Sequence, residues 1–326
     1  MTEVGGIENG VAIGREGTLF LTGGAHDVMA FALGTRTPAD QTFANFQANL
    51  AGRAAWAAAN AAAYVHLIFP DKQSYATEFW PFAPPLRLGE MHANRVAPGL
   101  RDAIMYPADL LAAHRDAVMS KVDTHMRMAG SAIIAAELAR RVTGHDQSGR
   151  LAALLADMTE PHESAGDLGS KLTPPRREMS MLSATVPQGR FISNSLAAGN
   201  NGMIDIRISR KAAFGQRVLI FGDSFARQAA MYLQWFFAEI LFCRTGYFHP
   251  EIADAFRPDV LITSTAERYL SGVASDAERP LFLMYPWLNG GTHSPSEQFA
   301  QALSAMLSYP REPYRRFIDQ ARPRAD

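Results

Sequence analysis

Short apolar runs alternate along the chain with longer segments of helical character. Residues 218–221 are apolar and partly β-branched, follow a Gly-Gln-Arg turn and end at Gly222, which predicts a buried strand of a parallel sheet. Residues 225–242 contain no Pro or Gly and are rich in apolar side chains, which predicts a long helix. The same reasoning predicts further strands at residues 64–69, 260–263 and 281–285.

Helical patterns fill most of the intervals between these strands. In residues 42–63, large apolar side chains recur at the spacing of one helical face, whereas residues 11–21 predict a hairpin of two short strands. Strands and helices alternate in both halves of the chain without an internal repeat. This predicts an α/β fold with a doubly wound, mainly parallel sheet and helices on both faces, as in flavodoxin-like proteins. Further helices are predicted at residues 105–117, 130–142, 149–158 and 296–307.

The stretch from about residue 144 to 210 differs in texture, because it is rich in Gly, Pro, Ser and Thr. After the predicted helix it indicates a loop or small β region, with Ile192, Met203 and Ile206 as strand residues. We therefore expect residues 1–326 to form a single domain with an insertion at about 144–210. The insertion is either a lobe that binds substrate or a surface decoration.

Composition narrows the classes of function. The 326 residues include 31 Lys plus Arg and 32 Asp plus Glu, so the net charge is −1 and no basic surplus favours nucleic-acid binding. The single cysteine, Cys243, allows no internal disulfide and no Cys-x-x-Cys zinc site. No apolar run is long enough for a transmembrane helix. The N-terminus lacks the features of a signal peptide, so we expect a cytoplasmic protein as the sequence stands, or a periplasmic one if the N-terminus was trimmed.

Ser224 follows the predicted strand and precedes the predicted helix. Its hydroxyl would therefore project from the carboxyl edge of the sheet, where open α/β folds place ligands. Free amide groups at a helix N-terminus suit an anion that develops on a reacting acyl group. The alternative is that Ser224 only caps the helix.

Asp123 and His125 are two residues apart in a segment that precedes a helical run. One segment can therefore supply both a base and the carboxylate that orients it, as Ser-His-Asp catalysis requires. The alternative for this short pattern is a solvated loop. The Asp-x-His pattern favours catalysis over this alternative only because the chain also contains the Gly-Asp-Ser segment at the edge of the predicted sheet.

Three segments, in this order, resemble the SGNH-hydrolase-like acetyltransferase domain of the alginate O-acetylation type. They are Lys121-Val-Asp123-Thr-His125, the strand that leads into Gly222-Asp223-Ser224-Phe225, and the run from Arg257-Pro-Asp259 to Glu267-Arg268. Ordinary SGNH esterases have the serine segment first, so the order here is that of the permuted acetyltransferase-like family. Met126 departs from the family, which usually has an aromatic residue there. Two shorter matches precede these segments, Gly14-Arg-Glu-Gly17-Thr-Leu-Phe20 and Ile68-Phe-Pro70-Asp-Lys72.

The resemblance implies that Ser224 accepts the acyl group, that His125 is the general base and that Asp123 orients it. It implies an acetyl donor, a carbohydrate or polysaccharide acceptor, partner proteins of polysaccharide biosynthesis, and neither cofactor nor metal. The Ser224 amide would supply part of the oxyanion hole. The candidates for the second donor or for substrate binding are Asp223, Arg227, Asn194, Asn200, Asn201, Glu267, Arg268 and Tyr269.

Three other functions compete with acetyl transfer. A carbohydrate acetyl esterase would use the same catalytic residues, with water as the acceptor. A carbohydrate-binding relative would not catalyse any reaction. A metallophosphoesterase also uses Asp-x-His followed by Gly-Asp, but its Gly-Asn-His segment is missing and the later histidines are not spaced as ligands.

Overall fold

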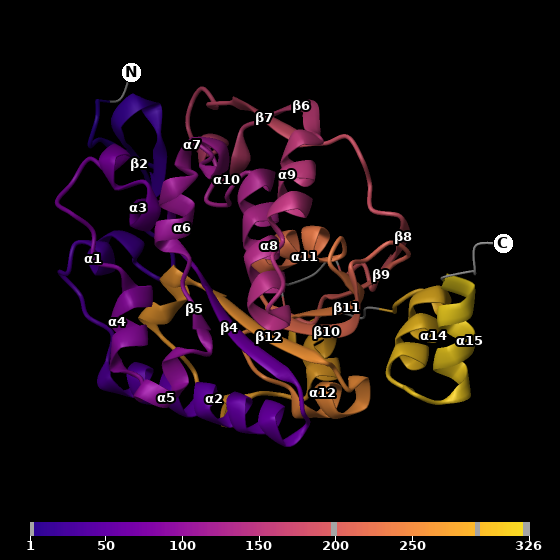
Figure 1. Ribbon diagram of the computed structural model, residues 1–326. Helices are drawn as coiled ribbons and strands as arrows, with labels where there is room; N and C mark the ends of the chain where they lie inside the picture. The colour runs from indigo at the N-terminus through magenta and orange to yellow at the C-terminus, as the bar shows by residue number, and fades with distance from the viewer. Residues whose placement is uncertain (1–2, 197–200, 291–293, 322–326) are drawn as a thin grey trace.

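The computed structural model describes residues 3–196, 201–290 and 294–321. A seven-stranded sheet lies at the centre of the molecule, in the order β5-β4-β12-β10-β11-β9-β8 (Figure 1). The strands from β5 to β11 are parallel, β9 is antiparallel to β11, and β8 is antiparallel to β9. The strands are β4 (Ala63–Phe69), β5 (Ile104–Met105), β8 (Gly189–Ser193), β9 (Ile204–Ser209), β10 (Phe214–Gly222), β11 (Phe237–Arg244) and β12 (Val260–Ala266).

Helices cover both faces of this sheet, because its central strands are apolar on both sides. In β10, Val218 and Ile220 face one core cluster, whereas Leu219 and Phe221 face another. Figure 1 shows α8 and α11 above the strands and α2 and α12 below them. The first layer contains α8 (Met128–Thr143), α9 (Ser148–Ala156) and α11 (Ser224–Leu233), and the second contains α2 (Asp40–Ala59), α12 (Pro250–Phe256), α14 (Glu297–Met306) and α15 (Glu312–Ala321).

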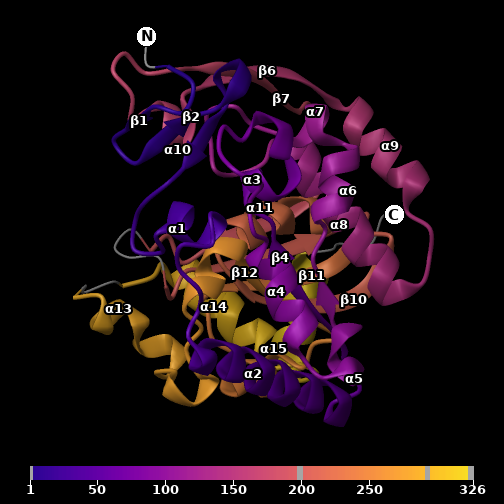
Figure 2. The same cartoon turned by 90° about the vertical axis from the view of Figure 1, so that its left-hand side faces the viewer.

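Two small sheets flank this core. An N-terminal antiparallel sheet contains β1 (Ile7–Glu8), β2 (Val11–Ile13) and β3 (Leu19–Leu21), and β6 (Met158–Ser164) pairs with β7 (Glu178–Ser183). Figure 2 shows both at the same end of the molecule, near α10. The shorter helices are α1 (Val28–Ala32), α3 (Lys72–Tyr75), α4 (Leu88–Arg95), α5 (Pro98–Arg101), α6 (Ala108–Ala113), α7 (Arg115–Val118), α10 (Gly166–Gly169) and α13 (Tyr285–Leu288), and the 3-10 turns are η1 (Arg15–Gly17), η2 (Thr77–Phe79), η3 (Glu267–Ser271), η4 (Asp276–Glu278) and η5 (Phe282–Met284).

The predicted fold class is confirmed, but three predicted elements are wrong. Residues 105–117 are not one helix, because β5 ends at Met105 and the two short helices α6 and α7 follow. The predicted strand residue Met203 precedes β9. The segment 225–242 is not one helix, because α11 ends at Leu233 and β11 begins at Phe237. Residues 281–285 are not a strand but belong to η5 and α13. Both segments are apolar without a clear period, and such runs do not distinguish a buried strand from a buried helix. The second half of the stretch 144–210 contributes β8 and β9 to the main sheet.

Helices α8 and α11 pack against each other through small side chains. Both belong to one buried cluster, in which the helix contact is rich in alanine. Small side chains allow helix axes to approach closely. The buried alanines are Ala132, Ala135, Ala136 and Ala139 in α8, and Ala226, Ala229 and Ala230 in α11.

Among the described residues, no helix has both the length and the apolar character that a membrane span requires.

Candidate active site

Ser224 is the first residue of α11, at the carboxyl edge of the sheet. The cap of this helix is Asp223, not Ser224: Asp223 Oδ1 accepts hydrogen bonds from the amides of Phe225 (3.0 Å) and Ala226 (3.4 Å). Asp223 Oδ2 accepts a bond of 2.7 Å from the amide of Ala266 at the end of β12. Asp223 thus fixes the strand–helix turn, and the hydroxyl of Ser224 is free for other contacts.

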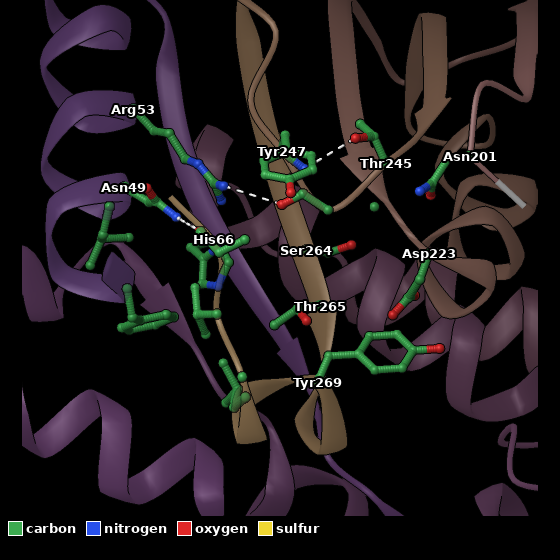
Figure 3. Close-up of a pocket in the computed structure, with 18 of the residues that line it drawn as sticks. Asn49, Arg53, His66, Asn201, Asp223, Thr245, Tyr247, Ser264, Thr265 and Tyr269 are labelled. Carbon is green, nitrogen blue, oxygen red and sulfur yellow. Dashed lines mark hydrogen bonds between the residues drawn. The ribbon is translucent and has the colours of Figure 1, made fainter. Parts of the chain in front are cut away.

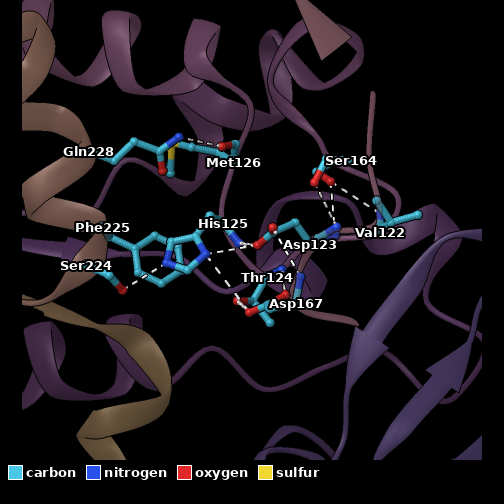
Figure 4. A network of polar contacts seen from close by, with 12 residues as sticks. Val122, Asp123, Thr124, His125, Met126, Ser164, Asp167, Ser224, Phe225 and Gln228 are labelled. Atoms are coloured by element: carbon cyan, nitrogen blue, oxygen red, sulfur yellow. Dashed lines mark hydrogen bonds and ion pairs between the residues drawn. The ribbon is translucent and has the colours of Figure 1, made fainter. Parts of the chain in front are cut away.

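The structure brings Ser224, His125 and Asp123 together (Figure 4). Ser224 Oγ lies 2.8 Å from His125 Nε2, and His125 Nδ1 lies 2.9 Å from Asp123 Oδ1. The backbone amide of His125 also donates to Asp123 Oδ1, at 2.8 Å. Because a carboxylate only accepts hydrogen bonds, the proton belongs on Nδ1, which leaves Nε2 to accept from the hydroxyl of Ser224.

The surroundings favour an ionised Asp123 and a fixed imidazole. Burial acts to raise the pKa of Asp123, but the hydrogen bonds from the side chain and backbone of His125 outweigh it and lower this pKa to about 2. The ring of Phe225 stacks on the ring of His125, with centroids 4.4 Å apart and an interplanar angle of 28°. Gln228 of α11 donates to the carbonyl of Met126 at 3.1 Å, which ties the histidine loop to the serine helix.

Asp167, in α10, supports the same loop and was not predicted from the sequence. Its carboxylate accepts hydrogen bonds from the amide (2.6 Å) and the hydroxyl of Thr124. Its own amide donates to Asp123 Oδ2 at 3.3 Å, and its Oδ2 lies 4.0 Å from His125 Nδ1. No signal in the sequence indicates this contact, because Asp167 lies in a Gly-rich stretch far along the chain from Thr124.

Glu178, in β7, holds the start of the loop. It accepts hydrogen bonds from the hydroxyl of Ser120 and, at 3.0 Å, from the amide of Lys121. It also pairs with Arg127 at 3.0 Å. Asp167 in α10 and Glu178 in β7 therefore hold the loop around the Asp-x-His segment at two places by hydrogen bonds.

Asp123, His125 and Asp167 also offer three ligand atoms within 4.8 Å of one another, which is close enough to hold a metal ion. Hydrogen bonds already use those atoms, between His125 and Asp123 and from Thr124 to Asp167. A two-metal phosphoesterase needs two such groups. The described residues contain only this one.

Glu267 and Arg268 lie behind the edge rather than at it, and both are buried. Glu267 accepts hydrogen bonds from the amide of Asp71 (2.9 Å) and the hydroxyl of Tyr106 (2.7 Å), and burial raises its pKa to about 7. Arg268 pairs with Asp71 at 2.5 Å. Through these contacts both side chains connect η3 to the Pro-Asp turn after β4.

Of the other predicted residues, some use their side chains for contacts within the protein and others line a cavity. Arg227 pairs with the buried Asp205 at 2.6 Å. Asn194 uses its side chain inside the loop before β9, where it donates to the carbonyl of Gly202 at 2.8 Å. Asn200 lies outside the described residues. Asn201 and Tyr269 line a cavity beside Ser224.

No protein-family model and no curated protein sequence matches this chain. Among solved structures, PatB1 of Bacillus cereus superposes with a TM-score of 0.55 at 11% identity, over 72% of this chain and 92% of that one. A DHHW family protein of Eubacterium siraeum superposes with a TM-score of 0.51 at 13% identity, over 84% and 95%. The O-acetyltransferase domain of Pseudomonas putida AlgJ gives 0.45 at 18% identity, over 83% and 96%.

The chain thus shares its overall α/β fold with PatB1 and with the DHHW family protein. The resemblance suggested by the sequence motifs is confirmed at the level of the fold. Identities this low concern the fold alone, so the chemistry has to be argued from the residues of this chain.

Proposed function

We propose that this protein transfers an acetyl group to a hydroxyl of a carbohydrate through an acyl-serine intermediate on Ser224. The observation that carries the proposal is the distance of 2.8 Å between Ser224 Oγ and His125 Nε2, in a histidine whose Nδ1 is held by Asp123. A serine becomes a nucleophile when an adjacent base can take its proton, and that base needs a fixed tautomer.

In the first half-reaction, Ser224 Oγ attacks the carbonyl carbon of the acetyl donor while His125 Nε2 takes the hydroxyl proton. The carbonyl oxygen becomes an oxyanion, which the amide of Ser224 at the start of α11 stabilises. Asp123 stabilises the imidazolium. The bond to the leaving group then breaks, and His125 returns its proton to that group.

In the second half-reaction, an acceptor hydroxyl gives its proton to His125 and attacks the acyl-serine. The tetrahedral intermediate collapses, Ser224 Oγ leaves and regains the proton from His125. A sugar hydroxyl as acceptor yields the acetylated carbohydrate, whereas water yields acetate. The motif order and the SGNH-like fold favour transfer, with an acetyl donor and polysaccharide-biosynthesis proteins as partners, over the esterase and over a carbohydrate-binding protein without activity.

Intact mass spectrometry tests the proposal. The wild-type protein incubated with p-nitrophenyl acetate should gain one acetyl group, and phenylmethanesulfonyl fluoride should add one sulfonyl group at the same serine. Ser224→Ala should gain neither, and His125→Ala should react far more slowly. An unchanged rate in Ser224→Ala would remove serine catalysis from the account.

A matched control is available in Ser271. Its Oγ also lies near an imidazole, 3.2 Å from His26 Nδ1, but among the described residues that histidine has no hydrogen bond to a carboxylate. Ser271→Ala should therefore be labelled like the wild-type protein. Polysaccharides that remove acetyl from Ser224 faster than water does would select the transferase, and removal by water alone would select the esterase.

A further inference from the structure

A cavity of about 520 Å³ opens beside the nucleophile. Its lining begins at Gly222 and Asp223, the two residues before Ser224, and extends under α2. This volume lies within the range of roughly 300–1,000 Å³ that is typical of small-molecule sites. Figure 3 shows Asn49, Arg53 and His66 on one side, Thr245, Asn201 and Asp223 on the other, and Ser264, Thr265 and Tyr269 between them.

The wall formed by α2 is held in place by an ion pair. Arg53 contacts both carboxylate oxygens of Asp276 at 2.7 Å, and it also donates to the carbonyl of Gly246 at 3.3 Å. The side chain of Asn49 donates to the carbonyl of Ala274 at 2.8 Å. These groups satisfy one another, so the wall exists before any ligand binds.

Two other side chains that line the cavity each have one buried polar atom without a hydrogen bond among the described residues. His66 is 4% exposed and Ser264 is 6% exposed. Within the described part of the chain, neither His66 Nε2 nor Ser264 Oγ makes a hydrogen bond, although His66 Nδ1 lies 2.8 Å from the hydroxyl of Thr263. Buried polar atoms almost always have partners, so these two atoms indicate that a polar ligand or water binds here.

The charges of the cavity balance. Its lining carries two cations, Arg53 and Arg244, and Asp223. Asp276 compensates Arg53, and Asp223 is the main favourable charge near Arg244. Burial keeps the pKa of His66 well below its usual value, so this imidazole is neutral near pH 7. Each of the two cations therefore has a carboxylate of the protein near it, and hydroxyl groups, which donate and accept, match the two free atoms.

We propose that this cavity binds an uncharged sugar unit of the acceptor, with His66 and Ser264 contacting its hydroxyls and Tyr247 closing the rim. The inference rests on the proposed function, because the acceptor hydroxyl must reach Ser224, which directly follows the lining residues Gly222 and Asp223. The rings of Tyr247 and Tyr269, which line the same cavity, offer apolar faces to the carbon-bound side of a pyranose. The polysaccharide is accordingly neutral at the acetylated position.

Isothermal titration calorimetry on the Ser224→Ala protein tests this specificity without turnover. The probes are neutral tetrasaccharides of different configuration, cellotetraose and mannotetraose, and the acidic tetragalacturonate. At least one neutral probe should bind at least tenfold more tightly than tetragalacturonate. Tighter binding of the acidic probe, or no binding of any probe, would overturn the proposal.

Variants in the same Ser224→Ala background locate the binding. Ser264→Ala removes one hydroxyl and Tyr247→Ala removes one ring from the rim, and each should weaken binding of the neutral probe by roughly fivefold. Tyr309→Phe, a tyrosine away from the cavity, is the control and should bind normally. Equal affinities in all variants would contradict the assignment. If sulfonyl labelling of Ser224 in the wild-type protein succeeds while sugar binding fails, only this inference falls; failed labelling removes the proposed function.

Discussion

Asp167 holds Thr124, the residue between Asp123 and His125, through both of its carboxylate oxygens. The contact joins α10, in the stretch between residues 144 and 210, to the loop that carries the proposed base. This part of the stretch is therefore neither a surface decoration nor only a substrate lobe. It holds the loop that carries both Asp123 and His125.

Asp167→Asn should lower kcat by roughly tenfold and leave KM nearly unchanged, because it loosens the loop that positions His125 without touching the cavity. Steady-state hydrolysis of p-nitrophenyl acetate measures both constants. Asp167→Glu, which keeps the carboxylate, should recover part of the rate. Asp157 provides the control, because it accepts the same pair of hydrogen bonds from Thr185 (2.9 and 2.6 Å) away from the triad. Asp157→Asn should keep kcat, and an equal loss in both Asn variants would argue against a positioning role.

Gly166→Ala should impair both stability and activity. Gly166 has φ = +58°, and a Cβ there would lie 2.5 Å from the carbonyl oxygen of Val122 and 2.8 Å from Asp123 Oδ2. Gly144 also has a positive φ (+72°) but nothing within 4 Å of the added Cβ. The free energy of unfolding of Gly144→Ala should thus fall by only about 1 kcal/mol, because of the unfavourable positive φ, and kcat should be retained. Urea unfolding and kcat for both variants separate the effects; a Gly166→Ala protein with normal kcat would show that Asp123 tolerates the displacement.

Arg227→Met should destabilise the fold by about 2 kcal/mol, because it leaves the fully buried Asp205 without its main partner. Arg207, whose Nη2 lies 4.0 Å from Asp205 Oδ2, supplies partial compensation. Adding Asp205→Asn to Arg227→Met should restore part of the loss, since the buried charge is then removed. Urea midpoints of the two single variants and the double variant provide the measurement, and additive losses would disprove the coupling.

Glu267 should make the folded protein less stable as the pH rises from about 5 to 8. Its folded pKa of about 7 lies above the ordinary 4.5, so the folded state binds more protons in this window than the unfolded state. The stabilising contribution is present below the lower value and is lost as pH passes the higher one. The free energy of unfolding of the wild-type protein, relative to Glu267→Gln, should decline by about 2 kcal/mol between pH 5 and pH 8. Parallel profiles for the two proteins would contradict the raised pKa.

The fold class could be predicted because strands and helices alternate with recognisable boundaries in most of the chain. The exception at residues 225–242 has a physical cause. No Gly or Pro marks the turn between Leu233 and Phe237, and β11 is buried on both faces, so its apolar run lacks the period of two. Only the pairing with β10 and β9 distinguishes it from a helix.

The three residues of the candidate triad could be chosen from the sequence because each lies in a short motif at an expected edge. Asp167 could not be found, since a long-range carboxylate–threonine contact leaves no local pattern. The candidates Glu267 and Arg268 belonged to a motif as well, yet burial assigns them to the packing behind the site. A motif therefore identifies residues near the candidate site. It does not distinguish those that can contact a substrate from those that only support the fold around the site.

Ser224 begins α11, and His125 lies shortly before α8. The distance between these two side chains therefore depends on how closely the two helices pack, and alanine methyl groups set that packing distance. Adding two carbons there, for instance with Ala229→Val, would push the helices apart and lengthen the distance between the hydroxyl of Ser224 and the imidazole of His125. A substitution in the buried interior, at a side chain that contacts no substrate, can consequently alter the proton transfer on which the proposed reaction depends.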